Sequence, residues 1–220
     1  MSGPTTAGFF FAFEGGEGTG KTTQLKVLAD TLTERGYDLV LTHEPGDSPV
    51  GGRLRELLLD PATDITAQTE ALLYAADRAE HVAHVVTPAL RRGAVVITDR
   101  YMDSSISYQG FGRGLDLEEV IRTSRWATGG LLPHLTLILD LPVELGLRRA
   151  RGRSGRADRL EAEAIDFHER VRAGFLQLAK ADPARYAVID AAGAPDQVAS
   201  AVQAAVFAVL GLEPATKEQE

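Results

Sequence analysis

The chain contains no cysteine and no asparagine, and only four of its 23 basic residues are lysine. Without cysteine it can form no disulfide, no cysteine-ligated zinc or iron–sulfur centre and no thiol nucleophile. Acidic residues outnumber basic residues by 31 to 23, which gives a formal net charge of −8. This balance argues against binding to nucleic acid through a large basic surface.

Long hydrophobic runs are also missing, because proline, glycine or charged residues interrupt each apolar stretch. No segment is therefore long enough to cross a bilayer. The first eight residues have neither the basic nor the apolar region of a secretory signal, so we expect a cytoplasmic protein with no membrane partner. A length of 220 residues and a hydrophobic content of 44% suit one domain with a sizeable core.

Short apolar runs alternate with segments in which apolar residues recur at helical spacing. The runs predict strands over 9–13, 38–42, 94–98, 135–141 and 186–190. The other segments predict a helix that ends at Gly36 and helices over 54–59, 67–92 (bent near Pro88), 117–128, 143–151, 160–180 and 197–210. Such alternation is typical of right-handed βαβ units. We predict a single α/β domain over 1–220, with a parallel sheet of about five strands covered by helices on both faces.

Arginine is concentrated in one short part of the chain. Six arginines fall within the twelve positions 148–159, in a stretch that also contains two glycines and few apolar residues. We expect a mobile loop at about 150–158 and a frayed tail at 213–220. A local arginine cluster on an acidic protein suits a small polyanion better than a long one.

Residues 15–22 (GGEGTGKT) match the pattern G-x-x-x-x-G-K-[ST] between a predicted strand and a predicted helix. In this context backbone N–H groups and the helix N-terminus bind phosphates. Lys21 would reach the outer phosphates, and the Thr22 hydroxyl would ligate Mg²⁺. The alternative is a tight glycine turn followed by an ordinary lysine. The predicted ATP-binding residues are Gly15, Gly16, Glu17, Gly18, Thr19, Gly20, Lys21, Thr22 and Thr23.

Asp99 ends the third predicted strand, at the sheet edge where ligands bind in open α/β folds. A carboxylate there can hold Mg²⁺ or its waters, although it can also simply cap a turn. Arg100 follows it and suits a bidentate phosphate contact. A GTPase is excluded because its Asn-Lys-x-Asp guanine reader needs asparagine. A small P-loop kinase of a small acceptor fits the length and the arginine-rich loop.

Several segments resemble bacterial thymidylate kinases in their order and spacing. They are EGGEGTGKTT, HEPG, LLYAADR, TDRYMDSSISYQG, LILDLP and RARGRSGRADR, and they extend from about Phe9 to Asp190. Many families share the P-loop, whereas the run DRYxxSSxxYQG together with EPG and AADR is more specific. The resemblance implies a P-loop NTPase three-layer fold, transfer of the γ-phosphoryl group of ATP·Mg²⁺ to dTMP to give dTDP for dTTP biosynthesis, and a homodimer.

The resemblance also implies roles for individual residues. Glu17 is similar to the carboxylate that binds the 3′-hydroxyl of the acceptor sugar, and Tyr108 to the tyrosine packed against C2′. Arg78 is similar to the arginine that reaches the base. Tyr74, four residues earlier and on the same helical face, is similar to the aromatic residue that stacks on the base. Core packing or a solvated helix face is the alternative for Tyr74 and Arg78.

The resemblance also implies roles in acceptor binding for residues whose chemistry is less specific. Ser105 and Gln109 match family positions near the base, and Arg55 and Arg100 resemble arginines that grip the acceptor phosphate. His43 stands where relatives commonly have arginine, and a mostly neutral histidine is a weak anion ligand.

The arginine-rich segment resembles the lid of the family. Because the P-loop carries no extra cation, the lid would supply the positive charge in the transition state, from Arg151, Arg153 or Arg156. A solvated helix end is the alternative for each of them. Two other functions stay open, namely a kinase of another nucleotide, nucleoside or metabolite and a nucleotide-binding module without turnover.

Overall fold

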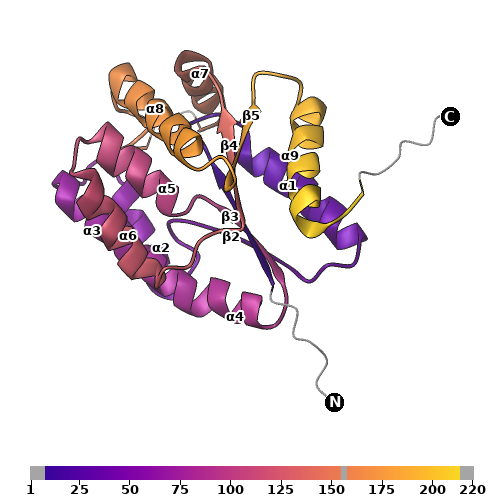
Figure 1. Cartoon of the computed structure of the whole chain (residues 1–220). Helices are drawn as coiled ribbons and strands as arrows, with labels where there is room; N and C mark the ends of the chain where they lie inside the picture. The colour runs from indigo at the N-terminus through magenta and orange to yellow at the C-terminus, as the bar shows by residue number, and fades with distance from the viewer. Residues whose placement is uncertain (1–7, 155–157, 214–220) are drawn as a thin grey trace.

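The structure is a computed structural model that describes residues 8–154 and 158–213. Five parallel strands form one sheet in the order β2-β3-β1-β4-β5 (Figure 1). The strands are β1 (Phe9–Glu14), β2 (Leu39–His43), β3 (Val95–Asp99), β4 (Leu135–Asp140) and β5 (Tyr186–Asp190). The predicted α/β fold with a five-stranded parallel sheet is therefore confirmed.

Helices cover both faces of this sheet, with α1 and α9 on one side and α3, α4, α6 and α8 on the other (Figure 1). The α-helices are α1 (Lys21–Glu34), α2 (Pro49–Leu59), α3 (Ala67–His81), α4 (Thr87–Arg91), α5 (Met102–Ser105), α6 (Leu117–Thr128), α7 (Val143–Ser154), α8 (Ile165–Ala181) and α9 (Pro195–Leu210). Two π-helical segments, η1 (Val82–Val86) and η2 (Ile106–Gly112), follow α3 and α5. The predicted helix over 67–92 is thus α3, η1 and α4 in succession. Its π-helical turn directly precedes Pro88, which has no N–H for a helical bond.

Two predicted helices begin five residues away from their observed first residue, and one helical region was not predicted. α2 begins at Pro49 rather than at 54, because the Ser48 hydroxyl accepts a hydrogen bond from Gly51 N and Pro49 suits the first helical position. α8 begins at Ile165 rather than at 160, because the Asp158 carboxylate instead accepts from the backbone of Leu160 and Glu161 in a turn. The α5–η2 region lacks a clear apolar period in the sequence.

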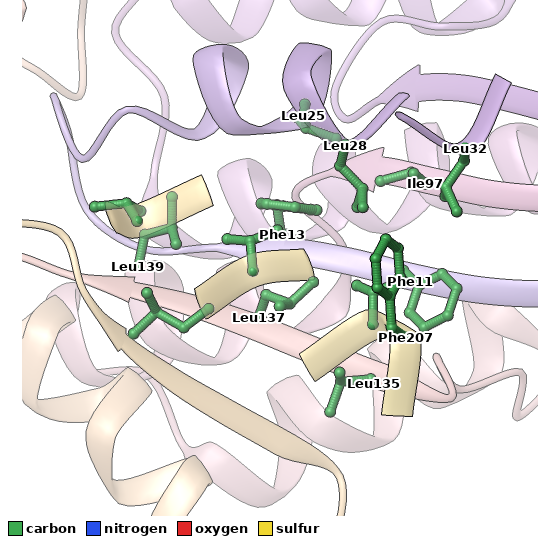
Figure 2. Packing of buried hydrophobic residues seen from close by; sticks show 14 of the residues in the cluster. Phe11, Phe13, Leu25, Leu28, Leu32, Ile97, Leu135, Leu137, Leu139 and Phe207 are labelled. Carbon is green, nitrogen blue, oxygen red and sulfur yellow. The ribbon is translucent and has the colours of Figure 1, made fainter. Parts of the chain in front are cut away.

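The core follows from the alternation of side chains along β1. Phe11 and Phe13 point to the α1–α9 face, where α1 contributes Leu25, Leu28 and Leu32 and α9 contributes Phe207 (Figure 2). Phe10 and Ala12 point to the opposite face and pack with buried residues of η1, α4 and α5. Burial on both faces explains why this central strand is apolar at almost every position.

The parallel strands all end at the same edge of the sheet. Glu14, His43, Asp99 and Asp140 are the last residues of β1 to β4, so this edge collects polar side chains from four separate segments. Ligands bind at this edge in open α/β folds. Among the described helices, none combines the length and the apolar character that a membrane crossing requires.

Candidate active site

A cleft of about 580 Å³ opens at this edge of the sheet. It is lined by the loop between β1 and α1, the segment between β2 and α2, one turn of α3, the region from Asp99 to η2, and residues 158–161. Most of the predicted site residues line it, namely Glu17, Gly18, Thr19, Gly20, Lys21, Thr22, Arg55, Tyr74, Asp99, Arg100, Ser105, Tyr108 and Gln109. The tertiary structure thus brings together residues that are as much as 92 positions apart in the sequence, from Glu17 to Gln109.

The glycine-rich loop wraps around the N-terminus of α1. Gly18 has a left-handed backbone with φ of 66°, and a Cβ atom there would lie 2.0 Å from the backbone oxygen of Gly146 in α7. A side chain at this position is therefore excluded by both strain and space. Lys21 donates through Nζ to the Gly15 and Gly16 carbonyl oxygens at 3.1 and 2.9 Å. Burial and the nearby Arg100 lower the pKa of Lys21.

The Thr22 and Asp99 side chains lie close to each other at the sheet edge. The Thr22 hydroxyl lies 3.5 Å from Asp99 Oδ2, and Asp99 Oδ1 is buried without a hydrogen-bond partner among the described residues. A buried carboxylate oxygen with no donor is unfavourable unless something else contacts it. Hydroxyl and carboxylate oxygens are the ligands that Mg²⁺ prefers, so these two residues fit that ion.

Glu17, Arg100 and Tyr108 form a hydrogen-bonded group inside the cleft. Arg100 Nη2 donates to Glu17 Oε1 at 2.8 Å, and the Tyr108 hydroxyl donates to the same oxygen at 2.7 Å. The Arg100 guanidinium also lies over the Tyr108 ring, 4.9 Å from its centroid. Burial alone would raise the pKa of Glu17, but Arg100 and Lys21 outweigh it and lower the pKa to about 2. This carboxylate is therefore charged, oriented and able to accept from a ligand hydroxyl.

Glu14 is a functional-site residue that sequence reasoning missed. It is fully buried at the end of β1, where its Oε1 accepts from the backbone N–H groups of Tyr101 and Ser104 and its Oε2 accepts from the Ser104 hydroxyl. Burial and the nearby Asp103 raise the pKa of Glu14 to about 8. These bonds hold the turn in which Arg100 adopts a left-handed φ of 72°, a strained conformation for a residue with a side chain.

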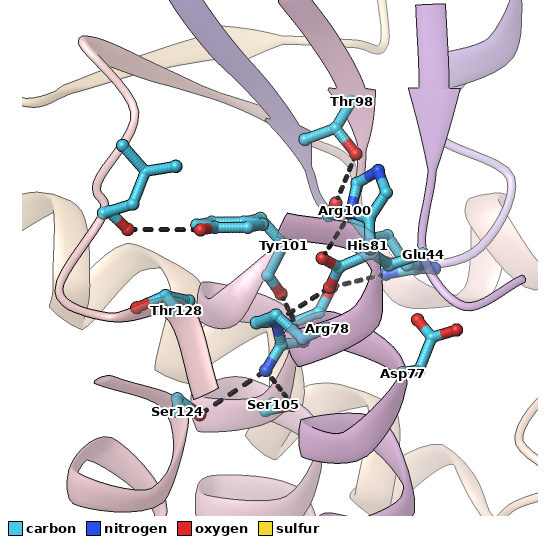
Figure 3. Close-up of polar contacts among 12 residues, drawn as sticks. Glu44, Asp77, Arg78, His81, Thr98, Arg100, Tyr101, Ser105, Ser124 and Thr128 are labelled. Carbon is cyan, nitrogen blue, oxygen red and sulfur yellow. Dashed lines mark hydrogen bonds and ion pairs between the residues drawn. The ribbon is translucent and has the colours of Figure 1, made fainter. Parts of the chain in front are cut away.

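Arg78 does not line the cleft. It is 1% exposed, and its guanidinium donates to Glu44 Oε2 at 2.8 Å, to the Ser105 hydroxyl at 3.1 Å and to the Tyr101 carbonyl at 3.0 Å (Figure 3). His81 Nδ1 lies 2.8 Å from the other oxygen of Glu44. A buried guanidinium needs such partners because desolvation of an unpaired charge is costly. Arg78 thus lies behind the cleft wall, bonded to Glu44 and Ser105, which line the cleft, and the prediction that it reaches the base stays a prediction.

The other predicted acceptor-site residues lie closer to the cleft surface. Arg55 donates through Nη1 to the Pro45 carbonyl at 2.7 Å, which ties α2 to the segment after β2. Tyr74 is buried in the wall, and burial with the nearby Glu70 raises the pKa of its hydroxyl, so it stays neutral. His43 also lines the cleft, with Nδ1 3.9 Å from the Asp47 carboxylate.

The predicted lid is described only in part. Arg151 is exposed in α7, and the backbone of Arg153 continues the same helix. Arg156, and the side chain of Arg153, lie outside the described residues. The prediction that one of these arginines contacts the transferred phosphoryl group therefore stays a prediction.

Comparison with known proteins identifies a family. The family model described as thymidylate kinase matches residues 13–202. A thymidylate kinase from Synechococcus sp. is 51% identical over 211 residues, which cover 95% of this chain and 99% of the relative. One from Clavibacter sepedonicus is also 51% identical, over 90% of this chain and 93% of the relative. A crystal structure of thymidylate kinase from Ehrlichia chaffeensis has a TM-score of 0.74 at 31% identity, and covers 91% of this chain and 99% of that one.

Proposed function

This chain belongs to the thymidylate kinase family, and we propose that its cleft binds ATP at the P-loop and dTMP against α3, Arg100 and η2. The chain phosphorylates dTMP to dTDP in the synthesis of dTTP, with ATP as the phosphoryl donor. The observation that carries the proposed arrangement is that thirteen predicted site residues line one continuous cleft. We propose a single kinase domain for the whole chain.

At the donor end, Lys21 and the loop amides are the groups proposed to bind the β- and γ-phosphates. Lys21 Nζ is hydrogen-bonded to two loop carbonyls, so its ammonium group lies inside the curve of the loop, where it would contact a bound phosphate. The low local solvation that depresses its pKa also strengthens its attraction to an anion. A bound Mg²⁺ would neutralise phosphate charge during transfer, and Thr22 and Asp99 are the residues proposed to hold it.

At the acceptor end, Glu17 and Tyr108 are proposed to select the sugar. The ionised Glu17 accepts from a 3′-hydroxyl, and the Tyr108 ring, fixed by its bond to Glu17, leaves little room beside C2′ for a ribose hydroxyl. Arg100 and Arg55 are proposed to hold the acceptor phosphate. Arg100 keeps its charge because Tyr108 and Glu17 raise its pKa although burial opposes it. The acceptor phosphate is already an anion at pH 7, so no general base is needed. An arginine of the segment 151–156 is proposed as the cation of the transition state.

Two further parts of the proposal concern the oligomeric state and the cellular location of the enzyme. Leu72 on α3 is 60% exposed and Trp126 on α6 is 85% exposed, and these two helices pack against each other. Large apolar side chains on adjacent helices suit contact with another surface, so we propose that a second copy of the chain covers them in a homodimer. Sedimentation equilibrium would give the mass directly. A cytoplasmic location, expected from the sequence, is also kept as a proposal.

The test of the proposed site is a coupled assay of ADP release with ATP and Mg²⁺, in the presence and absence of dTMP. We expect ADP release to require dTMP. The variant Asp99→Asn keeps the size of the side chain but removes its charge, so half-maximal activity should need at least about tenfold more Mg²⁺. Asp38→Asn is a matched control, because Asp38 pairs with Arg92 on the exposed surface. An Mg²⁺ titration of Asp99→Asn that overlays the wild-type curve would contradict the metal assignment.

A further inference from the structure

Glu70, in the first turn of α3, does not line the cleft, but its carboxylate contacts a residue that does. The side chain of Glu70 is 1% exposed. Gln109 Nε2 donates to Glu70 Oε1 at 2.8 Å, and Gln109 is part of the cleft wall. A buried carboxylate of α3 therefore controls one polar group of the proposed acceptor pocket.

Two arginines hold Glu70 in one orientation. Arg113 donates through Nε to Oε1 at 3.2 Å and through Nη2 to Oε2 at 3.0 Å, and Arg159 Nη1 donates to Oε2 at 2.5 Å. Arg159 is itself tied to α2, because its Nε donates to the Leu58 carbonyl. Burial would raise the pKa of Glu70, but Arg113, Gln109 and Arg159 lower it. With two cationic partners the carboxylate is ionised, and an ionised carboxylate only accepts hydrogen bonds.

This fixed acceptor decides which way the Gln109 amide points. A glutamine amide has a donor end and an acceptor end that are nearly equal in shape, so its orientation follows from its partners. Glu70 can only accept, and the Gln109 nitrogen must therefore face it. The Gln109 Oε1 atom is left at the opposite end of the amide, and none of the described residues forms a hydrogen bond to it. Gln109 lines the cleft and is otherwise buried, so in this orientation its carbonyl oxygen is the side-chain atom left for a ligand.

We propose that Glu70 is a positioning residue for base selectivity, because it fixes Gln109 so that its carbonyl oxygen accepts from the N3–H group of a thymine or uracil ring. This inference rests on the proposed placement of dTMP in the cleft. Cytosine has an unprotonated N3, which would put two acceptors face to face and leave both without a donor. A site built to hydrogen-bond an N–H group rejects an analogue that lacks it far more strongly than it rejects a change in apolar size.

The variant Glu70→Gln tests this role. A glutamine at position 70 can donate as well as accept, so the Gln109 amide is free to turn over. With ATP·Mg²⁺, kcat/KM is measured for dTMP, dUMP and dCMP in the wild type and the variant. We expect the ratio of dTMP to dCMP to fall at least about tenfold. The ratio of dTMP to dUMP should stay the same, because both bases carry the N3–H group.

Glu163→Gln is the matched control. Glu163 pairs with Arg113 at 2.5 Å in the same cluster but has no hydrogen bond to Gln109, so its loss should leave the ratio of dTMP to dCMP unchanged. The double variant Glu70→Gln/Gln109→Glu keeps one carboxylate in the cluster and puts an acceptor-only group at the cleft. It should therefore retain the wild-type preference for dTMP, and it serves as the test if Glu70→Gln alone does not fold.

The outcomes separate this inference from the proposed function. Failure of the wild type to phosphorylate dTMP would overturn both. If the wild type uses dTMP but does not discriminate against dCMP, or if Glu70→Gln lowers kcat/KM equally for all three nucleotides, Glu70 is only a packing residue and this inference is wrong. Loss of the preference in the double variant would overturn it as well. A selective gain for dCMP in Glu70→Gln, absent in Glu163→Gln, is the expected result.

Discussion

The two ends of the cleft are built by different means. The end proposed to bind phosphates is a single run, residues 15–22, which consists of glycine-rich backbone and the N-terminus of α1. The acceptor end is assembled from α2, α3, the α5–η2 region and residues 158–161, which meet only in the folded chain. At the first end the important groups are backbone amides and one lysine. At the second end, side chains are held by buried ion pairs behind the wall.

This difference between the two ends predicts which substitutions destabilise the fold and which lower only the rate of catalysis. Glu44, Glu70 and Arg78 are almost completely buried and take part in ion pairs, so removing one member of a pair leaves the other charge desolvated. Among the described residues, Lys21 Nζ hydrogen-bonds to two carbonyl groups of the P-loop, and Lys21 lines the cleft. We therefore expect stability to depend on the acceptor end and catalysis, without loss of stability, on the donor end.

The largest effect is expected for Arg78→Met, which fills a similar volume but leaves Glu44 with His81 as its one side-chain hydrogen-bond partner in the described part of the chain. We expect it to lower the free energy of unfolding by about 3–5 kcal/mol, measured by urea denaturation. Arg122→Met is the control, because Arg122 and Glu119 form an exposed pair whose side chains are 75% and 60% accessible. Such a pair contributes under about 1 kcal/mol. Equal losses in the two variants would refute the contrast between the two ends.

The next effect is expected at the donor end, for Lys21→Ala. Loss of the cation that is proposed to face the phosphates should lower kcat by about 10²–10³-fold, which corresponds to about 3–4 kcal/mol in the barrier. The free energy of unfolding should change by less than about 1 kcal/mol, because the lysine is already poorly solvated and pairs with no carboxylate by hydrogen bond among the described residues. Stopped-flow or coupled kinetics and urea denaturation on the same sample separate the two quantities. A variant that unfolds easily would contradict this prediction.

The smallest effect is a gain in stability at the acceptor end. Asp77 is buried, its Oδ1 accepts from Gly46 N, and its Oδ2 has no partner among the described residues. Burial and the nearby Glu44 raise the pKa of Asp77 to about 6 from an ordinary 3.8. The folded state thus holds this proton more tightly than the unfolded state. The protonated Asp77 carboxyl makes its full contribution to the free energy of unfolding below about pH 4, and this contribution is lost as the pH rises through 6.

Asp77→Asn removes this loss, because the amide keeps the bond to Gly46 and carries no charge. At pH 8 the variant should be more stable than the wild type by about 1–3 kcal/mol. The gap should close as the pH falls from 6 toward 4. Urea denaturation at several pH values measures it, with Asp38→Asn as an exposed control. A gap of constant size across this range would show that the ionisation of Asp77 does not control stability.

Local patterns were sufficient for the sheet and for the P-loop. The strand β5 and the helix α6 have the predicted bounds. The other four strands differ from the prediction by one residue, at one end in β1 and β4 and at both ends in β2 and β3. The Gly15–Thr22 motif forms the turn that its glycines require, because the conformation of each residue there depends on its immediate neighbours. The errors in α2 and α8 arose where one side chain decided the local backbone, because Ser48 caps the start of α2 and Asp158 holds residues 160 and 161 in a turn before α8.

The sequence by itself therefore determined the α/β class, the parallel sheet and the position of the glycine-rich turn between β1 and α1, since each depends on short-range periodicity or a contiguous motif. Only the tertiary structure decided that Arg78 lies behind the wall and that Glu14 and Glu70 support the site. Nothing in the neighbouring sequence distinguishes these buried residues from exposed helix or turn residues. Their role follows from partners about 30 to 90 positions away, which desolvation forces them to find.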